Sequence, residues 1–79
     1  MRTVTIFLDS MEKVKRFVNI MARDEGDYDL KSDAFMVDAK SVMGIFSLDF
    51  SKPLLLSIHD DSKYDLIRDN LRDVIVEQL

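Results

Sequence analysis

An extended segment leads into a short apolar helix over residues 37–48, which read Val37-Asp38-Ala39-Lys40-Ser41-Val42-Met43-Gly44-Ile45-Phe46-Ser47-Leu48. Ser41 suits the helix N-cap, because its hydroxyl can accept a hydrogen bond from a free backbone N–H two or three residues later. Helical spacing places Ile45 and Leu48 on one face. A second apolar face is made of Val42, Met43 and Phe46. A short helix that is apolar on two sides is either deeply buried or offers one side to a partner.

The composition is that of a small globular domain, and we expect a single domain over residues 1–79. Hydrophobic residues make up 47% of the chain, which is too much for a disordered tail. The net charge of −4 argues against a nucleic-acid partner, which needs a basic surface. The sequence contains no cysteine and no apolar run near the ~20 residues of a membrane span. We therefore expect a cytoplasmic protein that does not contact membranes.

Apolar spacing predicts two longer helices on either side of this stretch. The first follows a cap at Asp9 or Ser10, and we expect Gly26 to end it in a left-handed conformation. The second begins at Asp61 or Ser62. The stripe of the first helix is Met11, Val14, Phe17, Val18 and Met21, and that of the second is Ile67, Leu71, Val74 and Ile75.

Four segments rich in β-branched, aromatic and leucine residues predict strands, at residues 3–8, 28–32, 35–37 and 54–59. The second and third are joined by a turn at residues 32–34, which favours a hairpin. The predicted order is strand, helix, strand, strand, helix, strand, helix (βαββαβα). This order indicates the α+β class, as a two-layer sandwich with an antiparallel sheet covered by helices on one face.

The run from Val37 to Ile45 closely resembles the regulatory-serine segment of HPr, the histidine-containing phosphocarrier protein of the sugar phosphotransferase system. The resemblance extends without gaps over residues 9–59 and more loosely to the C-terminus. It implies the HPr-like open-faced sandwich, in which three helices cover one face of a four-stranded antiparallel sheet. The order of elements predicted from the residues agrees with that fold.

The resemblance also implies where the family keeps its chemistry. HPr carries phosphate on a histidine at the start of its first helix, and an arginine two residues later helps to hold it. Here those positions are Ser10 and Glu12. A serine phosphate is a stable ester, and Glu12 would repel the incoming phosphate. We therefore expect an HPr-like protein that lacks the active-site histidine, has no enzymatic activity and needs no metal or other cofactor.

Two further groups of polar residues have a functional and a structural interpretation. His59, the only histidine, is either a relocated phosphate acceptor or metal ligand, or a polar residue at a strand end. No second histidine or cysteine accompanies it, so we favour the strand end. The carboxylates around Gly26 offer a cation site, yet a solvated turn is the interpretation that we favour. These carboxylates are Asp24, Glu25, Asp27 and Asp29.

In the family, the serine that matches Ser41 is phosphorylated by an ATP-dependent HPr kinase, and the phosphoprotein then binds a transcriptional regulator. A phosphate at a helix N-terminus meets free N–H groups, so the physics of the site fits. The family also docks partners through the patch that corresponds to Val42, Met43 and Phe46. From the residues alone, Ser41 as a plain cap and the patch as part of the core stay open.

Three functions follow from these considerations. The first is a non-catalytic HPr-like regulator or adaptor, switched by phosphate on Ser41, whose partners would be HPr kinase and a transcriptional regulator or phosphotransferase component. The second is an interaction module that shares only the fold and has no link to sugar transport. The third, a divergent phosphocarrier, is disfavoured by Ser10 and Glu12.

Overall fold

The computed structural model describes residues 1–33 and 35–76, and it confirms the predicted order of elements. Ala34, in the expected hairpin turn, lies outside the described residues. A 3₁₀ turn, η1, precedes the last helix and was not expected. The elements are β1 (Arg2–Ile6), α1 (Met11–Arg23), β2 (Tyr28–Lys31), β3 (Met36–Asp38), α2 (Val42–Phe46), β4 (Leu54–Ile58), η1 (Asp61–Lys63) and α3 (Tyr64–Asn70).

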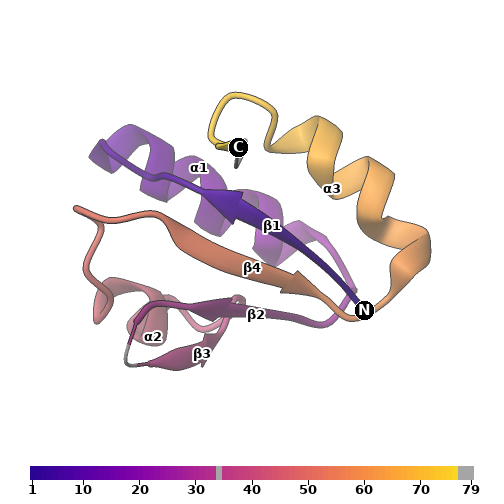
Figure 1. Ribbon diagram of the computed structural model, residues 1–79, viewed down its shortest axis with the longest axis horizontal. Helices are drawn as coiled ribbons and strands as arrows, with labels where there is room; N and C mark the ends of the chain where they lie inside the picture. Colours follow the sequence, from indigo (N-terminus) through magenta and orange to yellow (C-terminus); the bar gives the residue numbers. More distant parts are fainter. Residues whose placement is uncertain (34, 77–79) are drawn as a thin grey trace.

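The four strands form one antiparallel sheet in the order β1-β4-β2-β3 (Figure 1). β4 is the central partner, since Ile58 lies opposite Arg2 of β1 on one side and opposite Tyr28 of β2 on the other. The last strand in chain order therefore lies between the first strand and the β2–β3 hairpin.

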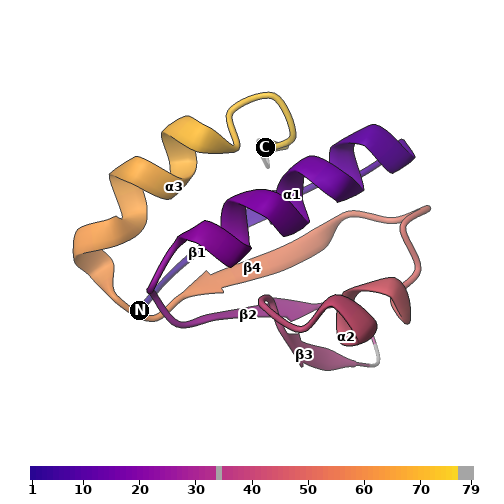
Figure 2. The same ribbon diagram turned by 180° about the vertical axis from the view of Figure 1, so that it is seen from behind.

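The core lies between one face of the sheet and the helices. Residues of β1, β2 and β4 alternate between buried and more exposed, as expected for a sheet with one covered face. The helices lie on that covered face (Figure 2). None of the described helices is long and apolar enough to cross a membrane. The buried side chains are Val4, Ile6, Leu8, Val14, Phe17, Met21, Tyr28, Leu30, Ala39, Ile45, Leu48, Leu54, Leu56, Ile58, Ile67, Leu71 and Val74.

The last helix is shorter than predicted. α3 ends at Asn70, whereas the apolar spacing predicted helix through Ile75. The chain beyond α3 instead pairs with the outer edge of β1, where the Phe7 N–H donates to the Val74 carbonyl and the Val76 N–H to the Thr5 carbonyl, both at 2.8 Å. The unpaired backbone groups of an edge strand explain this outcome, because they gain partners that a longer helix would not supply.

The expected left-handed conformation of Gly26 is wrong. No described glycine has a positive φ, and α1 ends with Asp24 as an extended C-cap. A glycine is needed for a different reason, which is close approach. A Cβ on Gly26 would lie 2.6 Å from the Tyr28 hydroxyl and 2.7 Å from Cδ of Lys63. Any larger residue would therefore displace the side chains packed over this turn.

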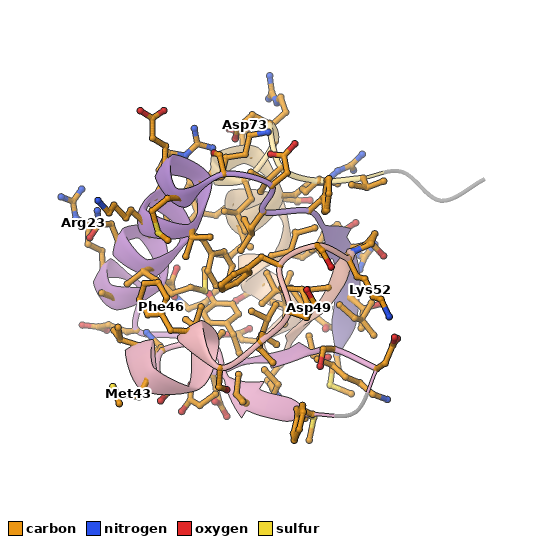
Figure 3. All side chains as sticks on the ribbon, turned by 90° about the vertical axis from the view of Figure 1, so that its left-hand side faces the viewer. Arg23, Met43, Phe46, Asp49, Lys52 and Asp73 are labelled. Carbon is orange, nitrogen blue, oxygen red and sulfur yellow. The ribbon has the colours of Figure 1, made fainter. Side chains whose placement is uncertain are left out.

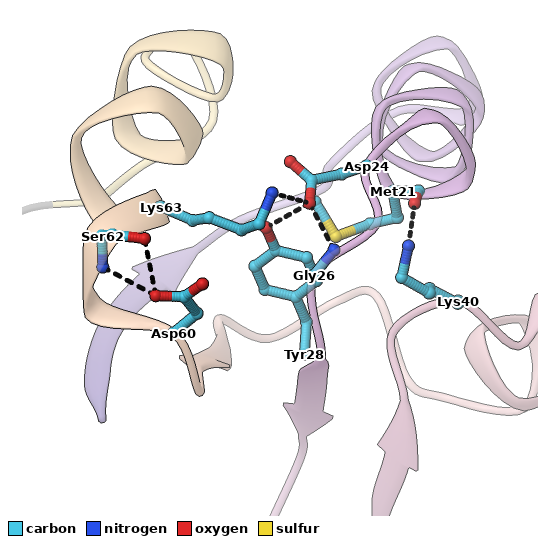
Figure 4. A network of polar contacts seen from close by, with 8 residues as sticks. All are labelled: Met21, Asp24, Gly26, Tyr28, Lys40, Asp60, Ser62 and Lys63. Carbon is cyan, nitrogen blue, oxygen red and sulfur yellow. Dashed lines mark hydrogen bonds and ion pairs between the residues drawn. The ribbon is translucent and has the colours of Figure 1, made fainter.

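The Asp24 carboxylate ties α1, β2 and η1 together (Figure 4). Its Oδ1 accepts hydrogen bonds from the Gly26 N–H and the Tyr28 hydroxyl, each at 2.7 Å, and lies 3.2 Å from the Lys63 ammonium. Burial opposes ionisation of this side chain, which is 9% exposed, but the three donors outweigh it and lower the pKa of Asp24. Burial and the neighbouring carboxylate raise the pKa of Tyr28. Asp24 is thus a structural residue and not part of a solvated turn.

Replacing Asp24 with Asn should lower the free energy of unfolding at pH 7 by about 1–3 kcal/mol, because a nearly buried charge-assisted network is lost. Folding lowers the pKa of Asp24, so its stabilisation is present above the unfolded-state value of 3.8 and disappears as the pH falls through the lower folded-state value. Urea unfolding of both proteins from pH 7 down to about pH 2 measures this difference.

Asp33→Asn is the matched control, since the Asp33 side chain is exposed and its contact with Lys52 is 3.4 Å long. Its effect should stay within about ±0.5 kcal/mol. Equal losses in the two variants at pH 7, or an Asp24→Asn deficit that persists undiminished at low pH, would contradict the assigned network.

Candidate functional site

Ser41 is the N-cap of α2, as the sequence predicts. Its hydroxyl accepts a hydrogen bond from the Gly44 N–H at 3.2 Å, and its carbonyl accepts one from the Ile45 N–H at 2.9 Å. The turn before it is also fixed, because Asp38 accepts from the Ser41 N–H through its carbonyl and from the Lys40 N–H through its carboxylate. The Ser41 side chain is exposed. The hydroxyl is therefore held at a defined position that solvent can reach.

The two apolar sides of α2 separate as the spacing predicts. Ile45 is fully buried and Leu48, just beyond the helix, is 6% exposed. On the other side Phe46 is 47% exposed and Met43 85% exposed, and Val42 is exposed to the same extent as Phe46. Figure 3 shows Met43 at the outer margin of α2. Val42, Met43 and Phe46 thus form an exposed patch, here called the α2 patch.

Gly44 allows α2 to lie close to β3. A Cβ at this position would lie 3.1 Å from Cβ of Val37 and 3.2 Å from the Ser41 hydroxyl oxygen, which is tighter than ordinary van der Waals contact. The absence of a side chain therefore lets the helix settle onto the hairpin while the Ser41 cap forms. This role of Gly44 is not visible in the sequence, because it depends on contact with a neighbouring strand.

The α2 patch continues toward the start of α1. Phe46 contacts Phe50 edge to face, with ring centroids 6.5 Å apart. Phe50 in turn lines a shallow cavity of about 330 Å³, together with Leu8, Asp9, Ser10, Met11, Val14 and Ser51. Met11 was expected in the core stripe of α1. It is exposed instead, because it occupies the first position of the helix, where it lines this cavity. The apolar surface is therefore larger than the three residues that the sequence indicates.

Ser10 is the N-cap of α1, and its hydroxyl accepts a hydrogen bond from the Lys13 N–H at 3.2 Å. The Lys13 ammonium is paired with Asp9 at 2.7 Å, and this hydrogen bond lowers the pKa of Asp9. Glu12 adds a second carboxylate in the first turn. The start of α1 thus carries two carboxylates and one cation that is already paired. Such a site suits a capped helix better than the binding of a phosphate.

His59 lies at the far end of the sheet from Ser10. Its Nε2 is 2.6 Å from the Asp29 carboxylate, and its backbone N–H donates to the Asp27 carbonyl. His59 follows Ile58, which pairs with Arg2 at the start of β1, whereas Ser10 follows the other end of β1. The imidazole is therefore about a strand length from the start of α1. It cannot replace a histidine at that helix.

The acidic residues near Gly26 do not converge on a common point. Asp24 is bound in the network around Tyr28, and Asp29 pairs with His59 on the other side of β2. Within residues 1–33 and 35–76, no group of three or more carboxylate, histidine or cysteine side chains is placed to hold a metal ion. The cation site considered from the sequence therefore has no geometric support.

The chain leaves α2 through a turn built on Asp49. Its carboxylate accepts hydrogen bonds from the Ser51 N–H at 2.9 Å and the Ser51 hydroxyl at 2.6 Å, and these bonds lower the pKa of Asp49. An Asp followed two residues later by Ser is a known turn signal. The spacing of Asp49 and Ser51 could have predicted this turn from the sequence. The turn places Phe50 beside Phe46.

Comparison with known proteins identifies the fold. No protein-family model matches the chain, and the curated proteins contain no match either. Among solved structures, the chain is similar to the crystal structure of HPr-C-His from Thermoanaerobacter tengcongensis, with 29% sequence identity, full coverage of both chains and a TM-score of 0.74. Together with the order of strands and helices, this similarity shows that the chain has the HPr-like α+β fold.

Proposed function

We propose that this protein is a non-catalytic, HPr-like adaptor of the phosphotransferase system that binds protein partners through the α2 patch and is switched by phosphorylation of Ser41. One arrangement carries the proposal. An exposed serine caps a helix whose inner side is anchored by Ile45 and whose outer side presents Val42, Met43 and Phe46 to solvent. The modification site and the binding surface therefore belong to the same short element.

The chemistry of phosphorylation at Ser41 fits this position. A phosphate at an N-cap adds about two negative charges beside free backbone N–H groups and the positive end of the helix dipole. The modification would therefore change the charge next to the α2 patch without melting the helix. A partner that buries the patch would gain or lose contacts with the phosphate, which is a direct way to switch affinity.

A phosphocarrier role finds little support at the start of α1. The Ser10 hydroxyl caps α1, and Asp9 and Glu12 place negative charge at the same end of the helix, where they would repel a phosphate. A serine phosphate formed there would not pass its phosphoryl group onward as readily as a phosphohistidine. The His59 ring lies at the other end of the sheet and is bound to Asp29.

The first prediction of this proposal is that no phosphate is acquired from phosphoenolpyruvate through the general phosphotransferase enzyme. Intact mass spectrometry at neutral pH measures any phosphate gained by the protein. A histidine-bearing HPr is the positive control. Acid-labile phosphate on this chain would restore the phosphocarrier interpretation.

The second prediction concerns Ser41. HPr kinase with ATP should add one phosphate, seen as a mass gain of about 80 Da, and Ser41→Ala should abolish it. Ser47→Ala is the matched control, because Ser47 lies at the other end of α2 and its hydroxyl donates to the Gly44 carbonyl at 2.6 Å. Ser41→Ala should also cost about 1 kcal/mol of stability through the lost cap. Phosphate retained on Ser41→Ala, or none on the natural protein, would leave Ser41 a structural cap and favour the fold-only interaction module.

The third prediction separates the anchor of α2 from its exposed side. Leu48→Ala should lower the free energy of unfolding by roughly 2–5 kcal/mol, since the side chain is buried. Met43→Ala should stay within about ±0.5 kcal/mol, and Phe46→Ala should cost about 1 kcal/mol through its contact with Phe50. Urea unfolding of the three variants provides the values. A Phe46→Ala loss as large as that of Leu48→Ala would make the patch part of the core.

A further inference from the structure

The methionine side chains differ widely in their access to solvent. Met43 is 85% exposed, more than any other large hydrophobic side chain of the described residues, whereas Met21 is fully buried. Met1, Met36 and Met11 are also exposed, at 72%, 66% and 54%. The sequence contains five methionines but neither cysteine nor tryptophan. No thiol or indole is therefore present to react first with an oxidant.

The position of Met43 makes its exposure relevant to the α2 patch. Met43 lies at the centre of the α2 patch, between Val42 and Phe46, on a helix that contains no charged residue. It is also two residues from Ser41, and Figure 3 shows it at the outer margin of α2. A change in the polarity of this one side chain changes the patch without touching the core.

We propose that Met43 is a site of reversible oxidation by peroxides and that its sulfoxide weakens docking through the α2 patch. In the reaction, a sulfur lone pair attacks one oxygen of hydrogen peroxide and the O–O bond breaks. The sulfur is oxidised by two electrons, the oxygen bound to it gives up its proton to form the sulfoxide, and the second oxygen takes up that proton and leaves as water. The docking consequence rests on the adaptor function proposed above.

The fold should tolerate this modification. Ile45 and Leu48 hold α2 against the body of the protein, and Met43 makes no contribution to the buried core. Sulfoxide at Met21, by contrast, would place a polar group among buried apolar side chains and destabilise the protein. Oxidation confined to Met43 therefore alters a surface while the melting temperature stays unchanged.

Graded exposure of the folded protein to hydrogen peroxide, followed by peptide mass mapping, tests the reactive site. Met43 should gain oxygen, a shift of about 16 Da, before Met1, Met36 and Met11. Met21 should react at least about tenfold more slowly, because it is reached only when the structure opens. The proposal is overturned if Met1, Met36 or Met11 is oxidised ahead of Met43.

Met43→Leu provides the matched control for the effect on the patch, because leucine keeps the apolar surface and cannot be oxidised. On a phenyl column, the natural protein should elute earlier after peroxide treatment and return to its first position after methionine sulfoxide reductase. Treated Met43→Leu should keep most of its retention. An equal change in the two proteins would show that Met43 does not govern the apolar surface, and would overturn the proposal.

The kinase reaction then tests the docking consequence. Oxidation should slow phosphorylation of Ser41 by roughly fivefold, the loss expected for one contributing interface side chain, and Met43→Leu should protect against this loss. Unchanged turnover of the oxidised natural protein would refute regulation of docking. If the untreated protein is not phosphorylated at all, the adaptor function and the docking consequence both fail, while mapping and column retention still decide whether Met43 is the oxidation site.

Discussion

The burial of Ile45 is the constraint on which the orientation of α2 and the exposure of its patch depend. α2 spans only residues Val42–Phe46, too short to be stable through its own hydrogen bonds. Ile45 fixes which side of the helix faces the core, and Gly44 lets the helix come close to β3. Once that side is fixed, the spacing of the remaining residues turns Met43 and Phe46 outward. Removal of the Ile45 anchor would leave neither a defined patch nor a defined cap.

Some polar groups of the chain join elements or shape the turns between them. Asp24, the C-cap of α1, accepts hydrogen bonds from the Gly26 N–H and the Tyr28 hydroxyl and pairs with Lys63 of η1. The Lys40 ammonium lies 2.9 Å from the Met21 carbonyl and connects the same end of α1 to the turn before α2. Asp49 shapes the exit from α2. These carboxylates hold neighbouring segments together, and the exposed α2 patch is the observation that supports the proposed adaptor over a phosphoryl carrier.

Local signals predicted most of the fold. The Ser10 and Ser41 caps, the strand order along the chain and the inward direction of Ile45 all follow from spacing and short-range chemistry. The predictions that are wrong concern places where segments distant in the sequence meet. The helix through Ile75 was wrong because the edge of β1 offers hydrogen-bond partners, and the left-handed Gly26 was wrong because Tyr28 and Lys63 crowd it. The continuation of the patch to Phe50 likewise depends on tertiary packing that periodicity cannot show.

The orientation of α2 is the central claim, and solvent accessibility measured by NMR tests it most directly. A soluble paramagnetic agent broadens the signals of side chains that solvent reaches. The methyl signals of Val42 and Met43 and the ring signals of Phe46 should broaden strongly, whereas the methyl signals of Ile45 and Leu48 should remain sharp. Sharp Phe46 signals together with broadened Ile45 signals would show the helix turned the other way and would contradict this account.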